Sequence, residues 1–401
     1  MSVVKAPRIF LPPAGTDLSK WAVLACDQYT SEPEYWHQLA AYVGPAPSTL
    51  QLIFPEAFLN EDPDARIQKI NRNMAMYLAH GVLRDVGECF VLVDRKTPFK
   101  PRRLGLVIAI DLEQYSPDPH SEALVRGTEK TVPARIPPRM HIRANAPLEV
   151  PHILLLMDDS QQHIIENLFE QRSRFPVLYD FDLNMGGGHL TGYQINDTRT
   201  IIRQLENLIE PHRLLFAVGD GNHSLAAAKA CWDALKPSLS EIEQNDHPAR
   251  YALVELENIY DPGLTFEPIH RVVFNVTQDF LDGLSDLSQG EAWCLTYTKK
   301  NGSKPYYLPE NAPEAVLLLQ NYIDAYLEEN KFSSVDYVHG LESLKAVCQT
   351  DPFAIGITLP PLNKADLVEY VSRHGVLPRK TFSMGEAAEK RYYMECRKII
   401  K

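Results

Sequence analysis

The residues whose types and spacing best suit chemistry lie in the turn Gly219-Asp220-Gly221-Asn222-His223-Ser224. The apolar run before it, residues 214–218, predicts a buried strand, and the alanine-rich residues 224–235 predict a helix. Glycines permit a tight turn and close approach of the backbone to a ligand. The start of a helix offers unpaired N–H groups that suit a phosphate. Asp220 is suited to hold Mg²⁺ or accept a hydroxyl proton, and His223 to bind phosphate or transfer a proton.

A purely structural interpretation of this turn is also open. Asn222 or Ser224 then caps the helix, and Asp220 closes the turn. The pattern is neither a P-loop nor a Rossmann fingerprint, because it lacks GK[ST] and GxGxxG. The polar cluster nevertheless follows a strand, at the end where α/β proteins place ligands, which favours a functional site.

A second group of candidates forms a basic stretch in an otherwise acidic chain. Its arginines and hydroxyls are Arg126, Arg135, Arg139, Arg143, Thr128 and Thr131. Guanidinium groups match phosphates and carboxylates, so the stretch predicts an anion clamp. The alternative is a solvated loop whose arginines pair with surface acids. Glu129 is a candidate for assisting metal binding, and residues 127–145 are predicted to be irregular because they show no clean period.

Two later segments carry further candidates for anion binding. His270 and Arg271 enter a predicted strand, where neighbouring side chains point to opposite faces. They provide an anion contact or form a hydrogen-bonded structural pair. Lys380 and Ser383 flank Thr381 in an irregular segment, where a lysine beside hydroxyls suits phosphate. The alternative there is an exposed C-terminal segment.

The elements that position these residues predict an α/β (α+β) fold. Strands and helices alternate too irregularly for a doubly wound sheet, so a mixed sheet is expected. A chain of 401 residues exceeds one ordinary core. We expect an N-terminal α/β domain over residues 1–240 that carries the turn, and a C-terminal α/β subdomain over residues 241–401 that completes the cleft. The polar stretch 236–248 is a candidate linker, residues 65–80 predict a helix, and Ser31 is a candidate cap for another.

Composition argues against a nucleic-acid-binding protein, a membrane protein and a disulfide-linked protein. A net charge of −12 argues against general nucleic-acid binding, which requires a basic face. No apolar run approaches the roughly 20 residues that span a bilayer, and the N-terminus lacks a signal pattern, so no membrane partner is expected. The six cysteines lie far apart without a CxxC pair, which favours reduced thiols and a cytoplasmic protein.

At the turn, the chain resembles the ParB/sulfiredoxin-like superfamily, in the branch that contains free serine kinases. Those kinases carry an Asp-Gly-His-His-Arg turn that leads into a helix. Over nearly its whole length the chain is similar to a largely uncharacterised bacterial family of similar length. The segments that support this similarity are 126–131, 147–152, 267–271 and 380–385. The resemblance implies a mixed-sheet ParB/sulfiredoxin-like core with an additional C-terminal subdomain.

The resemblance also assigns roles residue by residue. Asp220 and His223 match the turn of the kinases, whose Asp and His are implied to handle phosphate, metal and the seryl hydroxyl. Asn222 stands in place of the first His, and Ser224 in place of the Arg. Losing that Arg removes a bidentate phosphate donor, so another arginine must supply it or the phosphoryl donor differs.

The function that the resemblance implies is transfer of a phosphoryl group to the hydroxyl of free L-serine or a similar metabolite. Mg²⁺ is the expected cofactor, with ATP, ADP or pyrophosphate as donor. The implied base is an acidic residue near the N-terminus, where Asp27, Glu32 and Glu34 are the candidates, with Glu32 favoured and Asp27 next. Gly219, Gly221 and the basic stretch are expected to contact phosphate or substrate.

Two other functions compete with phosphoryl transfer. The substitutions at Asn222 and Ser224 are consistent with a protein that senses a nucleotide or metabolite without catalysis. The superfamily name alone suggests a DNA-associated protein, which the acidic charge opposes. The expected partners are therefore small molecules, an amino acid and a phosphoryl donor, and the sequence leaves a homodimer open.

Overall fold

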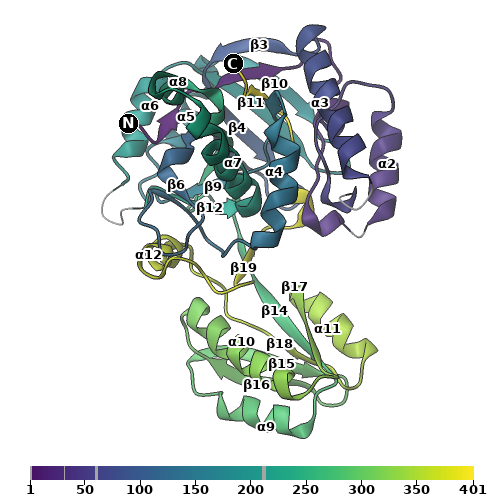
Figure 1. Cartoon of the computed structure of the whole chain (residues 1–401). Helices are drawn as coiled ribbons and strands as arrows, with labels where there is room; N and C mark the ends of the chain where they lie inside the picture. Colours follow the sequence, from purple (N-terminus) through teal and green to yellow (C-terminus); the bar gives the residue numbers. More distant parts are fainter. Residues whose placement is uncertain (1, 31, 59–61, 210–213) are drawn as a thin grey trace. The chain divides into compact units, whose positions relative to one another are not determined.

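The computed structural model describes residues 2–30, 32–58, 62–209 and 214–401, without the side chain of Asp27. Ser31, the predicted cap, lies outside these residues. The chain divides into two compact units (Figure 1). The first comprises the chain up to Leu264, Val371–Gly375 and Glu386–Lys401, and the second comprises Thr265–Tyr370 and Val376–Gly385. The boundary predicted at residue 240 falls inside the first unit, because the strand Tyr251–Asn258 pairs within its central sheet.

Among the described residues, ten strands form the mixed central sheet of the first unit. In spatial order, nine of them are β10 (Val177–Asp182), β11 (His189–Ile195), β4 (Phe90–Lys96), β5 (Arg103–Asp111), β13 (Tyr251–Asn258), β9 (Leu154–Met157), β12 (Phe216–Asp220), β7 (Val125–Gly127) and β6 (Tyr115–Ser116), and β1 (Val4–Lys5) pairs with β5. The pairs β13–β9, β12–β7 and β6–β7 are parallel, and the others are antiparallel. The predicted α+β fold with a mixed sheet is confirmed.

The sheet separates two hydrophobic cores because successive side chains of a strand point to opposite faces. In β4, Val91 and Val93 belong to one core, whereas Phe90 and Leu92 belong to the other. The helices on the two faces supply the remaining apolar side chains. The predicted helix at residues 65–80 is confirmed as α3 (Pro63–Ala79), whose stripe includes Ile70 in the first core.

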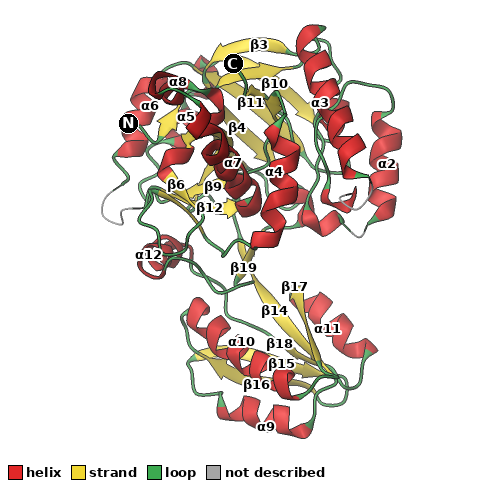
Figure 2. Ribbon diagram, viewed as in Figure 1, coloured by secondary structure: helices red, strands yellow, loops and turns green. Residues whose placement is uncertain are grey.

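The helices of the first unit surround this sheet (Figure 2). Besides α3 they are α1 (Leu18–Trp21), α2 (Pro33–Val43), α4 (Ile136–Ala144), α5 (Ile165–Glu170), α6 (Thr198–Glu206), α7 (Asn222–Leu235) and α8 (Glu241–Asp246). Two short ribbons complete the unit, β2 (Arg8–Leu11) with β3 (Arg84–Glu88) and β8 (Leu148–Glu149) with β20 (Arg397–Lys398).

Two segments are more regular than their sequences predict. Residues 127–145, expected to be irregular, contain α4, whose prolines lie in its first turn, where the missing N–H costs nothing. This helix packs on α7, and the Cys231 thiol donates to the Met140 carbonyl at 3.6 Å. The candidate linker 236–248 contains α8, which Ser240 and Glu243 start with a capping box.

The second unit has its own sheet, with helices on both faces. The strand order is β16 (Gly302–Leu308), β15 (Ala292–Thr298), β18 (Ile355–Ile357), β14 (Phe266–Phe274) and β17 (Ser334–His339), and β19 (Phe382–Met384) pairs with β14. Helices α9 (Gln278–Asp286) and α10 (Ala312–Glu329) supply one core, and α11 (Leu341–Thr350) supplies the other. Helix α12 (Lys364–His374) is divided between the units.

Within the described ranges, no helix is both long enough and apolar enough to cross a bilayer. All six cysteines lie in these ranges, and none is in a disulfide. Burial raises the pKa of Cys89 and of Cys294 to about 11, so both thiols are protonated at neutral pH and chemically inert.

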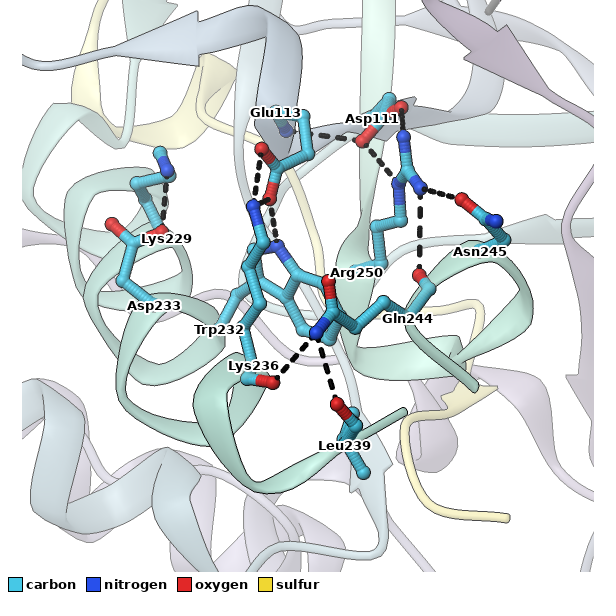
Figure 3. A network of polar contacts seen from close by, with 10 residues as sticks. All are labelled: Asp111, Glu113, Lys229, Trp232, Asp233, Lys236, Leu239, Gln244, Asn245 and Arg250. Atoms are coloured by element: carbon cyan, nitrogen blue, oxygen red, sulfur yellow. Dashed lines mark hydrogen bonds and ion pairs between the residues drawn. The ribbon is translucent and has the colours of Figure 1, made fainter. Parts of the chain in front are cut away.

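A polar network joins the sheet to the C-terminal end of α7, and it yields a test of stability (Figure 3). The Glu113 carboxylate accepts hydrogen bonds from the Trp232 indole at 2.5 Å and from the Lys236 ammonium at 2.9 Å. Burial by itself raises the pKa of Glu113, but these two donors outweigh it and hold the pKa below its usual value. Glu113→Gln is therefore expected to lower the free energy of unfolding by about 1 kcal/mol at neutral pH.

The pH dependence of this effect has a definite sign. Because the folded-state pKa of Glu113 is lowered, its contribution is complete above the unfolded-state pKa and is lost as pH falls through the folded-state pKa. Urea unfolding of both proteins across the acidic range measures the difference. Asp233→Asn is the matched control, since Asp233 binds Lys229 at 2.5 Å but its side chain is 49% exposed. An equal loss of stability in the two variants would contradict the assignment.

Candidate functional site

The turn between β12 and α7 joins a buried strand directly to the start of a helix. Strand β12 continues through Asp220, two residues beyond the predicted run, and α7 begins at Asn222. Gly221 lies between them with φ of 84°, and a Cβ there would meet Ile153 Cγ1 at 3.0 Å. The cap position of α7 is Gly221, which has no side chain to cap the helix, and the first intrahelical bond runs from the Leu225 N–H to the Gly221 carbonyl. The N-terminal end of a helix carries a partial positive charge, which favours a negatively charged ligand.

Asp220 is held at this helix start by a lysine from the C-terminal segment. Its Oδ2 lies 3.1 Å from the Lys390 Nζ, and its Oδ1 accepts the Gly221 N–H at 2.8 Å. The two side chains are 9% exposed for Lys390 and 32% exposed for Asp220. Burial alone raises the pKa of Asp220, but the Lys390 ammonium and then His152 outweigh it and hold the pKa below its usual value. Asp220 is thus an ionised carboxylate beside a cation at neutral pH.

His152 links the turn to the same C-terminal segment, and sequence reasoning missed this role. Its Nε2 lies 3.5 Å from the Ser224 Oγ, and its Nδ1 lies 2.7 Å from the Tyr393 Oη. Tyr393 is 8% exposed, and its pKa is raised by burial and then by the Asp220 charge, so its hydroxyl stays protonated. The only hint in the sequence was that His152 closes a segment shared with the similar bacterial family.

The remaining residues of the turn contact the neighbouring chain. The His223 Nε2 accepts the Val132 N–H at 3.0 Å. The Asn222 Oδ1 is buried without a hydrogen-bond partner in the described part of the chain. It lies against Gly127, where a Cβ would approach it to 2.8 Å. Asn222 therefore keeps its side-chain oxygen buried beside Gly127, and the missing side chain of that glycine makes the space for it.

The side chains of the basic stretch, residues 126–143, do not gather at one place in the structure. Strand β7 runs parallel to β12, and the Thr128 hydroxyl donates to the Val218 carbonyl at 2.7 Å, which locks the two strands together. Arg126 is 6% exposed and donates to the Ser121 carbonyl at 3.1 Å, while its Nε has no partner among the described residues. Burial lowers the pKa of Arg126.

The other residues of the basic stretch lie on α4 or just before it. Arg139 binds Glu56 at 2.6 Å, and Arg143 binds Glu149 at 2.7 Å. Arg135 is exposed at the start of α4, whereas Glu129 and Thr131 are partly buried. Because two arginines are engaged with carboxylates, the stretch does not present all its guanidinium groups together.

The predicted bases lie in a segment that passes beside Tyr393. The Tyr393 N–H donates to the Val23 carbonyl at 2.8 Å, which brings the chain that leads to η1 (Asp27–Tyr29) close to the turn. Glu32 is exposed at the start of α2 and makes no side-chain cap. The pKa of Tyr29 is raised by burial, then by Cys26 and Glu32, so Glu32 lies near Tyr29. The Asp27 side chain is outside the described part.

The remaining candidates belong to the second unit. The Arg271 guanidinium is fully buried and donates to the Ile269 and Lys380 carbonyls at 2.6 Å and 3.1 Å. The His270 Nδ1 accepts the Leu359 N–H at 3.2 Å, and burial lowers the pKa of His270 to about 4, so its ring is neutral. The Ser383 hydroxyl donates to the Gly385 carbonyl at 3.4 Å. These polar groups are engaged within their own unit.

The described residues contain no group of three His, Cys, Asp or Glu side chains arranged as a metal site. Such a group is not needed for Mg²⁺, which can take ligands from the substrate as well as from the protein. Mg²⁺ usually binds one or two carboxylates together with substrate phosphates rather than a cage of protein ligands. Asp220 fits this mode as a single carboxylate at a candidate phosphate site.

Three solved structures show low similarity to this chain. A conserved hypothetical protein from Pyrococcus furiosus has 10% identity over 73% of this chain and 95% of its own, with a TM-score of 0.36. SbnI with C-terminal truncation from Staphylococcus aureus has 11% identity over 72% and 85%, with a TM-score of 0.38. A free serine kinase in complex with AMP has 10% identity over 73% and 92%, with a TM-score of 0.38. Scores this low carry no conclusion about the site.

The comparison of sequences places the chain in a family. No curated protein matches the sequence. A family model matches residues 10–344, which is most of the chain and includes the β12–α7 turn. The chain therefore belongs to the family "Protein of unknown function (DUF1015)".

Proposed function

We propose that the protein is a phosphotransferase that moves a phosphoryl group to the hydroxyl of a small amino acid, with free L-serine as the first acceptor to test. One observation carries the proposal. An ionised Asp220, paired with Lys390 at 3.1 Å, lies at the N-terminus of α7, where a glycine occupies the cap position. A carboxylate, an ammonium and the positive end of a helix dipole are the positioning and charge-neutralising parts that phosphoryl transfer needs.

In this proposal Lys390 replaces the arginine that the kinase turn carries at the position of Ser224. It comes from the C-terminal segment and supplies a positive charge to the same turn. His223 accepts a backbone N–H at its Nε2, so the neutral ring carries its hydrogen at Nδ1 and acts as a donor there. In this proposal Lys390 and His223 contact the transferring phosphoryl group.

The cofactor and the base complete the proposal. Mg²⁺ is expected to bind one oxygen of Asp220 together with the donor phosphates, where it neutralises their charge. Glu32, or Asp27 in its place, is expected to take the proton of the acceptor hydroxyl, because the segment that carries both passes beside Tyr393. The donor is ATP, ADP or pyrophosphate.

Phosphorus NMR tests this function directly. Purified protein is incubated with L-serine and Mg²⁺, and with ATP, ADP or pyrophosphate in separate tubes. A phosphoserine signal in one tube names the donor, and Asp220→Ala is expected to remove that signal. Asp246→Ala is the matched control, because Asp246 is an exposed aspartate that binds Lys5 on the surface, with a side chain 86% exposed.

The same experiment separates the rival interpretation. No phosphoserine in any tube would exclude serine phosphorylation with these donors. Calorimetric titration with AMP, ADP and L-serine then distinguishes a sensor from an enzyme with another acceptor. A sensor binds without turnover, and Asp220→Ala weakens that binding.

A further inference from the structure

Ser224, His152 and Tyr393 form a chain of hydroxyl, imidazole and hydroxyl that the proposed roles leave unused. The Ser224 Oγ lies 3.5 Å from the His152 Nε2, and the Tyr393 Oη lies 2.7 Å from the His152 Nδ1. The three side chains come from α7, from the loop before β9, and from the C-terminal segment. A hydroxyl next to an imidazole whose other nitrogen is fixed by a third group is the arrangement that activates a serine nucleophile.

A second serine at a helix start shows what an ordinary capping role looks like. Ser240 accepts the Glu243 N–H at 3.4 Å and donates to the Glu243 carboxylate at 2.8 Å, so its hydroxyl serves the helix. Ser224 lies in the first turn of α7, but its hydroxyl faces the His152 ring instead of a backbone group. Ser224 therefore does not cap α7, since Gly221 occupies the cap position.

The surroundings suit negative charge on a group attached to Ser224. Ser224 lies in the first turn of α7, at the positive end of the helix dipole, and the Lys390 ammonium lies at the same turn through its contact with Asp220. His152 also helps to lower the pKa of Asp220, which places the imidazole close to that carboxylate. Donors aimed at one position stabilise the charge that develops on a phosphoryl group during transfer.

We propose that Ser224 is a nucleophile and that the phosphoryl group passes through a phosphoseryl enzyme. This inference rests on the proposed function and specifies its route. In the first step a bond forms between the Ser224 Oγ and the terminal phosphorus of the donor. The bond from that phosphorus to its bridging oxygen breaks, the shortened donor leaves with the electron pair, and the hydroxyl proton moves to the His152 Nε2.

The second step regenerates the enzyme. The acceptor hydroxyl attacks the phosphorus and gives its proton to the carboxylate base, Glu32 or Asp27. The bond between phosphorus and the Ser224 Oγ breaks, and His152 returns its proton to that oxygen. Tyr393 is a positioning residue, because it fixes the His152 ring through Nδ1 and does not itself meet the phosphoryl group.

The test uses the full chain with ATP, ADP or pyrophosphate and Mg²⁺, and without an acceptor. Intact mass and peptide mapping detect one added HPO₃ group and its position. Wild type and the control Ser240→Ala are expected to carry the group on Ser224, and Ser224→Ala is expected to carry none. His152→Gln is expected to form it about 100-fold more slowly, because it lacks the base. Tyr393→Phe is expected to shift the pH profile of this step.

Adding L-serine to the labelled enzyme separates the route from the function. Loss of the group from Ser224 with formation of phosphoserine supports both. If Ser224→Ala makes phosphoserine at the wild-type rate, transfer is direct and the inference is overturned while the proposed function stands. If Ser224 is labelled but no acceptor product forms, the nucleophile stands and the proposed function fails. Absence of both label and product overturns the inference, provided that circular dichroism shows folded protein.

Discussion

Replacing Lys390 with methionine is expected to lower kcat/KM for phosphoryl transfer by about 100-fold or more, the scale on which one charge-stabilising group acts in an active site. Its Nζ lies 3.1 Å from the Asp220 Oδ2 in a site where its own side chain is only 9% exposed. Methionine keeps a long, flexible side chain but removes the ammonium. The turn then has a carboxylate next to the incoming phosphate without the cation that offsets it.

The same substitution has a readout that does not depend on turnover. Lys390 is the strongest of the groups that hold the pKa of Asp220 down against burial, so Lys390→Met is expected to raise that pKa. Carbon NMR of the carboxyl group measures it. Lys398→Met is the matched control, because Lys398 belongs to the same C-terminal segment but is exposed and lies over the Phe10 ring. An unchanged kcat/KM in Lys390→Met would show that Lys390 has no role in phosphoryl transfer.

Arg391→Met is expected to lower the free energy of unfolding by about 3–5 kcal/mol, the usual result when one partner of a buried ion pair is removed. The guanidinium binds Glu255 at 2.6 Å and Glu395 at 2.7 Å, and it also donates to the Pro151 carbonyl. The side chains are 3% exposed for Arg391, 5% for Glu255 and 1% for Glu395. Without the arginine, Glu255 and Glu395 stay buried and both lose the cation that pairs with them.

The substitution is also expected to displace Lys390 and Tyr393 from the site, because Arg391 lies between them in the sequence. Arg391 anchors their segment to β13. Chemical denaturation measures the stability, and His152 ring signals in NMR report whether Tyr393 remains in place. Arg174→Met, an exposed arginine, is the control with little expected effect. Adding Glu255→Gln and Glu395→Gln to Arg391→Met should recover part of the stability, and a lack of recovery would contradict the electrostatic explanation.

The local elements around the turn were predictable from the sequence. The apolar run before Gly219, the glycines and the alanine-rich helix each leave a local pattern, and β12 and α7 follow it within two residues at their shared end. The amphipathic stripe of α3 and the mixed α+β class were predictable for the same reason. The errors at α4 and α8 also have local causes, since prolines and polar residues can start a helix as well as interrupt one.

Asp220, His223 and the helix start could be recognised as one candidate site from the amino-acid pattern, because neighbours in a strand–turn–helix unit stay neighbours in space. Only the tertiary structure brought Lys390, His152 and Tyr393 to that turn. His152 and Tyr393 are 241 positions apart, and no periodicity connects residues at such a distance. Their meeting depends on the order of strands in the central sheet and on the buried ion pairs of Arg391, which dock the C-terminal segment. Contacts of this kind arise from the packing of the whole unit, and a local pattern does not encode them.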